Sequence, residues 1–327
     1  MGGGVVLFID TSKCIGCKAC QVACKQWHSL PANMGTDVTF RGDYTNPPDF
    51  DGNNLTYVKF VERDDIEGMY GEQLQFLFFK NQCRHCVNPQ CKTACPQGVK
   101  KTKEGFVIFT ERCTQANVKK KYITGKAGTG SSGTTLVDSL SRSFEKMGVR
   151  TGMTVECMKR DAQNKPVKTS GTIDAINGSQ LTCHLFDSGH VSYDWAPGDK
   201  YKIIIDGLQL ACPFGVPRLN ATLGRYVKCD FCYDRFSFKY PSTYRDGKPT
   251  TACELACPTG AIQTIQYNSS KELFGGGGII RTRLREVKTK MYPRATLITS
   301  YGSRRFNVIW LLIDEPSKYG LKEYMSF

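Results

Sequence analysis

Apolar residues fall into short runs that alternate with polar loops along most of the chain. The runs VVLFID (5–10), LQFLFF (74–79) and GFVIFT (105–110) predict short strands, because brief apolar or β-branched segments between turn signals are typical of β structure. Each run leads into a loop that contains cysteine. We expect short helical turns to begin near Cys20, Cys91 and Cys253. This rhythm of strand, cysteine loop and short helix predicts an α+β fold.

Residues 114–210 follow a different pattern. The stretch TGKAGTGSSGTT (124–135) predicts a linker, and the GxGxxG match inside it does not follow a buried strand, as a dinucleotide site would require. Leu136, Leu140, Phe144 and Met147 recur at helical spacing up to Gly148, which predicts a helix. We expect the rest to form a small inserted β-barrel from strand-like segments at 153–158, 170–176, 181–186 and 201–205.

The last part of the chain returns to the first pattern. It contains a strand at 260–265, an amphipathic helix at 279–291 with Ile280, Leu284, Val287 and Met291 on one side, and a final strand at 306–314. The sequence therefore predicts three parts: residues 1–113, an insertion at 114–210, and residues 211–327.

The chain has 16 cysteines among 327 residues, and most of them are tightly grouped. A disulfide framework would spread its cysteines to join distant loops, whereas close groups are typical of metal sites. A fragmentary group combines Cys113 with the distant Cys212. The complete groups are Cys14, Cys17, Cys20 and Cys24; Cys83, Cys86, Cys91 and Cys95; and Cys229, Cys232, Cys253 and Cys257.

The spacing of the first group indicates iron. C-x2-C-x2-C-x3-C is the ligand pattern of bacterial ferredoxins, in which successive thiolates bind corners of one 4Fe-4S cubane. A zinc ribbon closes its site with two C-x2-C pairs and has no use for the third and fourth cysteine. If Cys20 begins a helix, Cys24 lies one turn later, about 6 Å along the axis. We therefore expect the fourth cysteine of each group to face a different cluster, held by a partner group.

The formal net charge of +14 at pH 7 suggests a nucleic-acid partner. That count treats cysteine as neutral, but a 4Fe-4S cluster with its four thiolates carries about two negative charges, so three clusters lower the balance to about +8. A basic shell around buried anionic clusters explains the charge, and we expect no nucleic-acid partner. The alternative is a zinc-stabilised nucleic-acid-binding protein, whose preparations would be colourless.

Six motifs together identify a family. They are FIDTSKCIGCKACQVACKQWH (8–28), NPPDF (46–50), FLFFKNQCRHCVNPQCK (76–92), ACPFGVPR (211–218), KCDFCYDR (228–235) and ACPTGAI (256–262). They resemble the four-cluster ferredoxin subunits of molybdenum or tungsten bis-pterin oxidoreductases, and most of all the β subunit of formate dehydrogenases. The resemblance implies tandem ferredoxin-like 4Fe-4S modules, with the β-barrel inserted between them.

The resemblance also implies ligand sets that cross between the groups. One cluster would take Cys14, Cys17, Cys20 and Cys257; a second, Cys24, Cys229, Cys232 and Cys253; and a third, Cys83, Cys86, Cys91 and Cys212. A fourth would use Cys95, Cys113 and two more cysteines, but Ala116 and Lys119 occupy the positions where the family pattern expects them.

Cys157 and Cys183 are the remaining candidates for a fourth cluster with Cys95 and Cys113. Sixteen thiols would suit four cubanes. However, Cys157 alternates in phase with Val155, and Cys183 with Leu181, which is typical of inward-facing barrel residues. We expect three clusters, with four as the alternative.

No serine, histidine and acid constellation is found in the sequence, and we expect no catalytic site of its own. His28 and His85 lie beside cysteine motifs, where they would tune a cluster potential or simply pack. The resemblance implies an electron-transfer subunit between a large molybdenum or tungsten bis-pterin catalytic subunit and an acceptor such as a cytochrome, a ferredoxin or a membrane subunit. The alternative catalytic partner is a reductase of sulfur, nitrogen or arsenic compounds.

The sequence contains no segment that we expect to enter a membrane. Its start, MGGGVVLFID, lacks the basic and apolar regions of a signal peptide, and the apolar run at 308–313 is shorter than the roughly 20 residues of a membrane helix. We therefore expect a soluble chain, exported to the periplasm together with its catalytic partner or retained in the cytoplasm.

Overall fold

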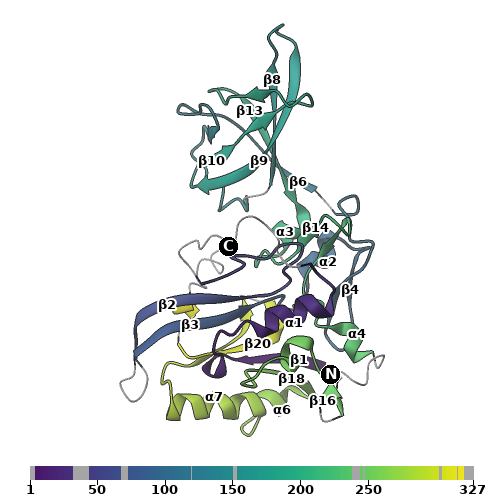
Figure 1. The fold of residues 1–327 in the computed structure, drawn as a ribbon, viewed down its shortest axis with the longest axis vertical. Helices are drawn as coiled ribbons and strands as arrows, with labels where there is room; N and C mark the ends of the chain where they lie inside the picture. Colours follow the sequence, from purple (N-terminus) through teal and green to yellow (C-terminus); the bar gives the residue numbers. More distant parts are fainter. Residues whose placement is uncertain are drawn as a thin grey trace. The chain divides into compact units, whose positions relative to one another are not determined.

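The chain forms two compact units in the computed structural model (Figure 1). Unit 1 comprises Met1–Asn117 and Cys212–Ser326, and unit 2 comprises Val118–Ala211. The structure describes residues 4–31, 44–67, 73–118, 120–149, 153–237, 244–245, 247–301, 304–314 and 316–319. None of the helices within these ranges combines the length and apolarity of a membrane-spanning helix.

Unit 1 is built on a sheet that joins the two ends of the chain. Strand β1 (Gly4–Asp10) pairs antiparallel with β18 (Ile262–Tyr267) and parallel with β20 (Arg304–Leu312), and β20 pairs antiparallel with β19 (Thr296–Tyr301). The strand order is therefore β18-β1-β20-β19. Strands from opposite ends of the sequence hold this unit together.

The period-two alternation of β1 directs its side chains to two different cores. Val6 and Phe8 pack with Ile280 and Val287 of α7 (Ile279–Lys290), and α6 (Ser270–Phe274) joins them through Leu273. Figure 1 shows α6 and α7 along one side of this sheet. Leu7 and Ile9 belong to the other core, which also contains Cys20, Cys83 and Cys253. This second face therefore carries the cysteine loops.

Short elements bring these loops to the sheet. The hairpin of β2 (Tyr57–Glu67) and β3 (Gln73–Asn81) contacts it through Trp310, whose Nε1 donates to the Lys80 carbonyl at 3.0 Å. The predicted helical turns near Cys20, Cys91 and Cys253 are confirmed as α1 (Ala19–Trp27), α2 (Gln90–Ala94) and α5 (Ala252–Leu255). The others are η1 (Thr11–Lys13), β4 (Val99–Lys101), β5 (Val107–Phe109), β14 (Arg218–Asn220), β15 (Arg225–Val227), α4 (Tyr233–Phe236), β16 (Tyr244–Arg245), β17 (Lys248–Pro249) and η3 (Pro316–Tyr319).

Unit 2 consists mainly of one strongly twisted sheet (Figure 1). Its strand order is β12-β11-β9-β8-β13-β6, and β10 pairs with both β7 and β9. Its core contains Trp195, Tyr201 and Ile203 together with Leu136 and Phe144. The elements are β6 (Lys120–Lys126), β7 (Thr135–Val137), β8 (Thr154–Arg160), β9 (Pro166–Asn177), β10 (Gln180–Cys183), β11 (Leu185–Phe186), β12 (Ser192–Tyr193), β13 (Lys200–Asp206) and α3 (Gly207–Ala211).

Two expectations for unit 2 were wrong. Leu136 lies in β7 opposite Leu181, Leu140 is 71% exposed, and no helix occurs among the described residues at 136–147. The Asp138 carboxylate accepts from the Arg142 N–H at 3.0 Å, and this side-chain bond ends the strand in a turn. The Gly- and Ser-rich stretch is not a linker either, since Ser131 is buried and Gly133 bridges to Trp195.

Candidate metal centres

The first cysteine loop owes its shape to a glycine. Gly16 has φ +67, and a Cβ on it would lie 2.6 Å from the Phe78 ring, so only glycine fits between Cys14 and Cys17. Before the loop, the Asp10 carboxylate accepts from the Ser12 N–H at 3.0 Å and caps η1. After the loop, α1 begins at Ala19. The loop therefore folds tightly enough for closely spaced thiols to face one point.

Cys14, Cys17, Cys20 and Cys257 line one cavity, which we call site 1. Cys20 lies in the first turn of α1, and Cys257 follows the end of α5. Burial, above all, raises the pKa of the Cys20 thiol to about 12, while nearby Lys80 acts in the opposite direction. Site 1 thus joins two loops that are far apart in the sequence.

Cys24, Cys229, Cys232 and Cys253 line a second cavity, which we call site 2. Cys24 lies one turn after Cys20 on α1, and Cys253 lies in α5, just before Cys257. Helices α1 and α5 pack against each other; α1 sends Cys20 to site 1 and Cys24 to site 2, while Cys253 of α5 lines site 2 and Cys257, just after α5, lines site 1. The fourth cysteine of the first group therefore faces a different cavity from the other three.

Cys83, Cys86, Cys91 and Cys212 form a third group, which we call site 3. Burial raises the pKa of Cys86 to about 12, with further contributions from the neighbouring thiols of Cys83 and Cys212. Cys91 interacts with the same thiols and also has a raised pKa, because it is buried. The guanidinium of Arg84, itself buried, faces Cys212, Cys83 and Cys86. The structure therefore brings these four cysteines together from two distant segments.

The donor atoms at sites 1, 2 and 3 suit a cluster of several metal atoms. Within the described part of the chain, no three His, Cys, Asp or Glu side chains are grouped so that they could hold one metal ion. Thiols that line a cavity fit a cubane, which binds each cysteine sulfur at a separate corner. Because burial raises the pKa of the Cys20 and Cys86 thiols, metal binding would release their protons. The residues present therefore fit 4Fe-4S clusters better than zinc.

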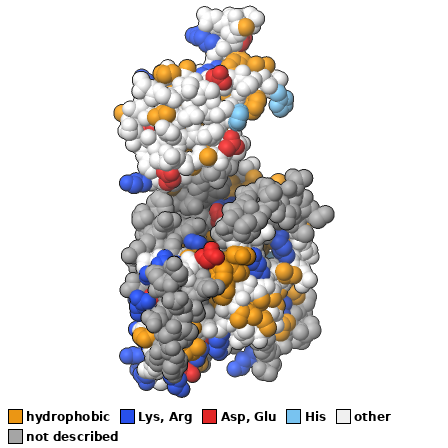
Figure 2. Space-filling view, turned by 60° about the vertical axis from the view of Figure 1, so that its left-hand side comes forward, with side chains coloured by type: hydrophobic (Ala, Val, Ile, Leu, Met, Phe, Trp, Pro, Cys, Tyr) orange, Lys and Arg blue, Asp and Glu red, His pale blue; other side chains and the backbone are white. Residues whose placement is uncertain are grey.

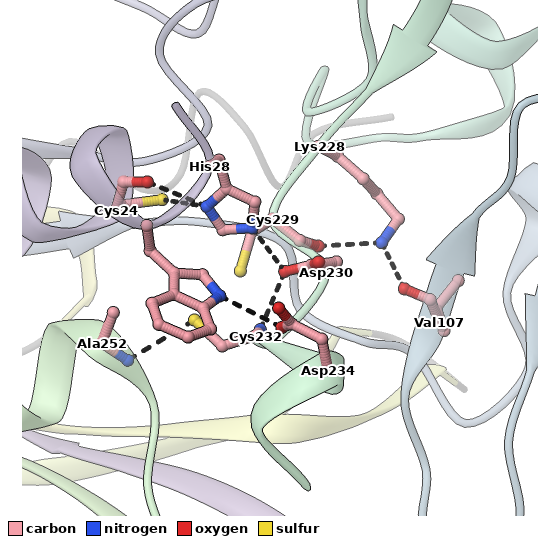
Figure 3. A network of polar contacts seen from close by, with 10 residues as sticks. Cys24, His28, Val107, Lys228, Cys229, Asp230, Cys232, Asp234 and Ala252 are labelled. Carbon is pink, nitrogen blue, oxygen red and sulfur yellow. Dashed lines mark hydrogen bonds and ion pairs between the residues drawn. The ribbon is translucent and has the colours of Figure 1, made fainter. Parts of the chain in front are cut away.

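A polar network surrounds site 2 (Figure 3). His28 Nδ1 lies 2.8 Å from the Cys24 carbonyl and 3.7 Å from its sulfur, and Nε2 lies 2.9 Å from an Asp230 oxygen. Burial opposes a charge on the imidazole, but the hydrogen bonds to Asp230 and Cys24 raise the pKa of His28 to about 11. The structure therefore places a charged imidazole beside a predicted ligand, in a position to stabilise negative charge at site 2.

Further groups around the sites donate towards sulfur. The N–H of Ala252 points at the Cys232 sulfur at 3.4 Å, and the N–H of His85 points at the Cys83 sulfur at the same distance. Hydrogen bonds to cysteine sulfur favour the reduced, more negative cluster. The His85 side chain is fully buried, and its Nδ1 accepts from Val107 N at 3.0 Å, so this ring packs rather than titrates.

Sequence reasoning missed the buried cations at these sites. Lys80, Arg84 and Lys228 are 2%, 7% and 4% exposed, although lysine and arginine are almost never fully buried without a partner. A signal exists for Lys80, which directly follows the apolar run LQFLFF (74–79) and comes just before the second cysteine group. The face drawn in Figure 2 shows other Lys and Arg side chains spread among apolar ones.

Cys95 and Cys113 are both fully buried in unit 1. Gly98 packs directly on Cys113, since a Cβ on Gly98 would lie 2.5 Å from the Cys113 Cα. The Gly98 N–H in turn donates to the Cys95 carbonyl at 3.3 Å. The two cysteines therefore lie on either side of one turn. Of the two positions where ligands are missing, Ala116 is exposed, and residue 119 lies outside the described residues.

Cys157 and Cys183 lie in the core of unit 2. They are 2% and 0% exposed and belong to the same apolar cluster as Leu181 and Val155. Burial raises their pKa values, that of Cys157 to about 11 and that of Cys183 to about 12. Each thiol contacts a backbone carbonyl, of Met158 and His184 respectively. Their surroundings are those of small apolar core residues.

Comparison with known proteins agrees with this chemistry. Residues 5–26 match the model of a 4Fe-4S binding domain, and residues 74–125 match that of a 4Fe-4S dicluster domain. The chain is 38% identical to the formate dehydrogenase subunit beta of Megalodesulfovibrio gigas, over 95% of both chains.

Two further relatives extend over almost the whole chain. The formate dehydrogenase 2 subunit beta (cytochrome c-553) of Nitratidesulfovibrio vulgaris is 27% identical over 98% of this chain and 97% of its own. The formate dehydrogenase-O iron-sulfur subunit of Escherichia coli is 27% identical over 98% of this chain and 71% of its own. The likeness therefore includes both units.

Proposed function

Because this chain belongs to the family of formate dehydrogenase iron-sulfur (beta) subunits, we propose that it is the electron-transfer subunit of a formate dehydrogenase complex. The observation that carries this proposal is the full-length likeness at 38% identity, together with three groups of four thiols in the structure. A 4Fe-4S cluster supplies reversible one-electron chemistry when it is bound. The chain itself contributes ligands, burial and charge.

The ligand sets of the three clusters are part of the proposal. We assign Cys14, Cys17, Cys20 and Cys257 to site 1; Cys24, Cys229, Cys232 and Cys253 to site 2; and Cys83, Cys86, Cys91 and Cys212 to site 3. The shared cavities and mutual interactions of these thiols support the assignment. Sites 1 and 2 exchange ligands through α1 and α5, so loading either cluster helps to fold the loop of the other.

We further propose that no fourth cluster forms. A fourth set would need Cys95 and Cys113 from unit 1 together with Cys157 and Cys183, which are buried in the apolar core of unit 2. The family pattern supplies two ligands after Cys113, where this chain has Ala116 and Lys119. In this proposal unit 1 contains tandem ferredoxin-like modules, and unit 2 is a small inserted β-barrel.

The partners follow from the same proposal. Formate oxidation or carbon dioxide reduction takes place at a molybdenum or tungsten bis-pterin centre in a larger catalytic subunit. The acceptor is a cytochrome, a ferredoxin or a membrane subunit, and the Nitratidesulfovibrio relative carries cytochrome c-553 in its name. The complex works in the periplasm after co-export or in the cytoplasm, and cell fractionation with an antibody against this chain would distinguish them.

The test is electron delivery from formate. The complex is purified anaerobically through a tag on this chain, its molybdenum and tungsten are measured, and electron paramagnetic resonance spectra are recorded with formate and with dithionite. We expect formate to generate the iron-sulfur signals that dithionite generates. Signals with dithionite but not with formate would refute the formate assignment, and reoxidation by a sulfur, nitrogen or arsenic oxide would favour the alternative partner. A colourless, iron-free complex would refute the whole proposal.

A further inference from the structure

Lys80 lies between sites 1 and 2. It lines both cavities, so its side chain is the cation common to the two predicted clusters. Its Nζ donates to Thr56 Oγ1 at 3.1 Å and to Gln82 Oε1, which are both neutral oxygens. The thiols of Cys253, Cys20, Cys229 and Cys24 all interact electrostatically with it. Cys253, Cys229 and Cys24 belong to site 2, and Cys20 belongs to site 1.

Lys228 holds the corresponding place between sites 2 and 3. It directly precedes Cys229 of site 2 and interacts with Cys83 and Cys91 of site 3. Its Nζ donates to the Val107 carbonyl and, at 2.9 Å, to the Cys229 carbonyl (Figure 3). The nearby carboxylate of Asp230 is engaged by His28. Arg84, by contrast, faces Cys212, Cys83 and Cys86, which all belong to site 3.

The burial of the two lysine ammonium groups requires a compensating negative charge. Burial disfavours the charged form of a lysine unless opposite charge compensates it. Both Nζ groups have only neutral oxygens as hydrogen-bond partners in the described structure. Thiols of two sites surround each lysine: Lys80 lines the cavities of both site 1 and site 2, and Lys228 interacts with Cys229 of site 2 and with Cys83 and Cys91 of site 3. The compensating charge is therefore the negative charge of ligated thiolates on both sides of each lysine.

We propose that Lys80 and Lys228 are positioning residues for electron transfer. Lys80 is a fixed cation between sites 1 and 2, and Lys228 is one between sites 2 and 3. Each raises the reduction potentials of the two clusters beside it. The inference rests on the proposed function. A positive charge in a low-dielectric interior stabilises the extra electron of a reduced cluster. Because each lysine faces two sites, it lowers the energy of the electron on both clusters. It therefore keeps the difference between their reduction potentials small. The lysines keep their protons while a single electron passes.

The arrangement predicts a pattern that a purely structural role would not produce. Lys80→Met should lower the potentials of sites 1 and 2, and Lys228→Met those of sites 2 and 3. Each variant should therefore shift two of three midpoint potentials, and the two shifted pairs should share one cluster. We expect each shift to equal about a tenfold or larger fall in the equilibrium constant of reduction, which is about 59 mV for one electron.

The experiment is a potentiometric titration of the purified complex, followed by electron paramagnetic resonance. Lys80→Arg and Lys228→Arg keep the charge and should retain the potentials. Lys271→Met removes an exposed charge on α6 and serves as the matched control. Potentials that do not move in loaded Met variants, or that move no more than in Lys271→Met, would overturn the inference. Absence of iron-sulfur signals in the unaltered complex would instead contradict the proposed function.

A second measurement covers variants that fail to load iron. The unaltered complex is prepared with 15N-lysine, and pulsed electron paramagnetic resonance of the reduced clusters is recorded. We expect hyperfine coupling to lysine nitrogen, and we expect this coupling to weaken in the Lys80→Arg and Lys228→Arg variants. A spectrum without lysine nitrogen coupling would overturn the inference without any Met variant.

Discussion

At the scale of single residues, one helical turn between Cys20 and Cys24 determines which site each thiol faces. Both are buried on α1, yet Cys20 lines site 1 and Cys24 lines site 2. The spacing alone indicated that the two thiols would face different clusters, because one turn displaces a side chain along the helix axis. Which distant cysteines complete each site is a long-range property, and spacing contains no information about it.

The first prediction concerns ligand and core cysteines. Cys24→Ala should lower the iron content of the purified chain from about twelve atoms, because site 2 loses a thiolate, while sites 1 and 3 keep their signals. Cys157→Ala is the matched control, since this thiol is 2% exposed in the core of unit 2. Iron and sulfide analysis measures both variants. Loss of a whole cluster from Cys157→Ala would instead support the four-cluster alternative.

The second prediction concerns Asp138, whose side chain is fully buried. Arg142 donates to its two oxygens at 2.9 and 2.8 Å, and Tyr201 donates to it as well. Asp138→Asn weakens these bonds and should lower the stability of unit 2 by about 1–3 kcal/mol. Hydrogen exchange of peptides from β8 and β13 in the full chain measures the loss. Unchanged exchange would contradict the structural role of this carboxylate.

The same group predicts a pH dependence. Hydrogen bonds from Arg142, above all, hold the pKa of Asp138 below its usual value, although burial alone would raise it. A depressed folded-state pKa stabilises the fold above the unfolded pKa of about 3.9, and this contribution is lost as the pH falls through the folded value. The difference between the natural chain and Asp138→Asn should therefore be full at neutral pH and shrink in acid.

At the scale of elements, α7 shows that an apolar stripe predicts packing well. Its stripe of Ile280 and Val287 faces Val6 and Phe8 of β1, and both α7 residues are 0% exposed. The residues at 136–147 have a similar stripe and form no helix, because Leu136 pairs in β7 and Asp138 turns the chain. Helical spacing is therefore informative only where no local side-chain bond competes with the backbone.

The third prediction compares neighbours on α7. Ile280→Ala should destabilise unit 1 by about 2–4 kcal/mol, because it leaves a cavity against β1. Ile279→Ala, at a position that is 54% exposed, should change stability by less than about 0.5 kcal/mol. Hydrogen exchange of β1 and β20 peptides in iron-loaded protein reports the difference. Equal effects of the two substitutions would show that α7 packs on another face.

At the scale of the whole molecule, the two units depend on different forces. The core of unit 1 includes Cys20, Cys83, Cys253 and other thiols assigned to clusters, whereas the core of unit 2 is formed by aromatic and aliphatic side chains around Trp195 and Tyr201. Metal binding is therefore linked to the folding of unit 1, and unit 2 is stabilised by apolar burial.

The fourth prediction follows from this difference. Removal of iron by an oxidant with a chelator should abolish the exchange protection of the cysteine loops and of α1 and α5. Peptides from β8, β9 and β13 should keep most of theirs, because they contribute no assigned ligand. Exchange measured by mass spectrometry on the same full chain compares the two. Simultaneous loss of protection in both units would contradict separate sources of stability.

The sequence by itself determined the chemistry of this protein and the local structure of its cysteine loops. Thiols two or three residues apart can reach one cubane only through a tight loop and a helical turn, so spacing and local fold are the same information. Tertiary structure alone decided that Lys80 and Lys228 lie between sites, and that Cys157 and Cys183 are enclosed in unit 2. Those facts depend on contacts between residues far apart in the chain, which a local pattern does not encode.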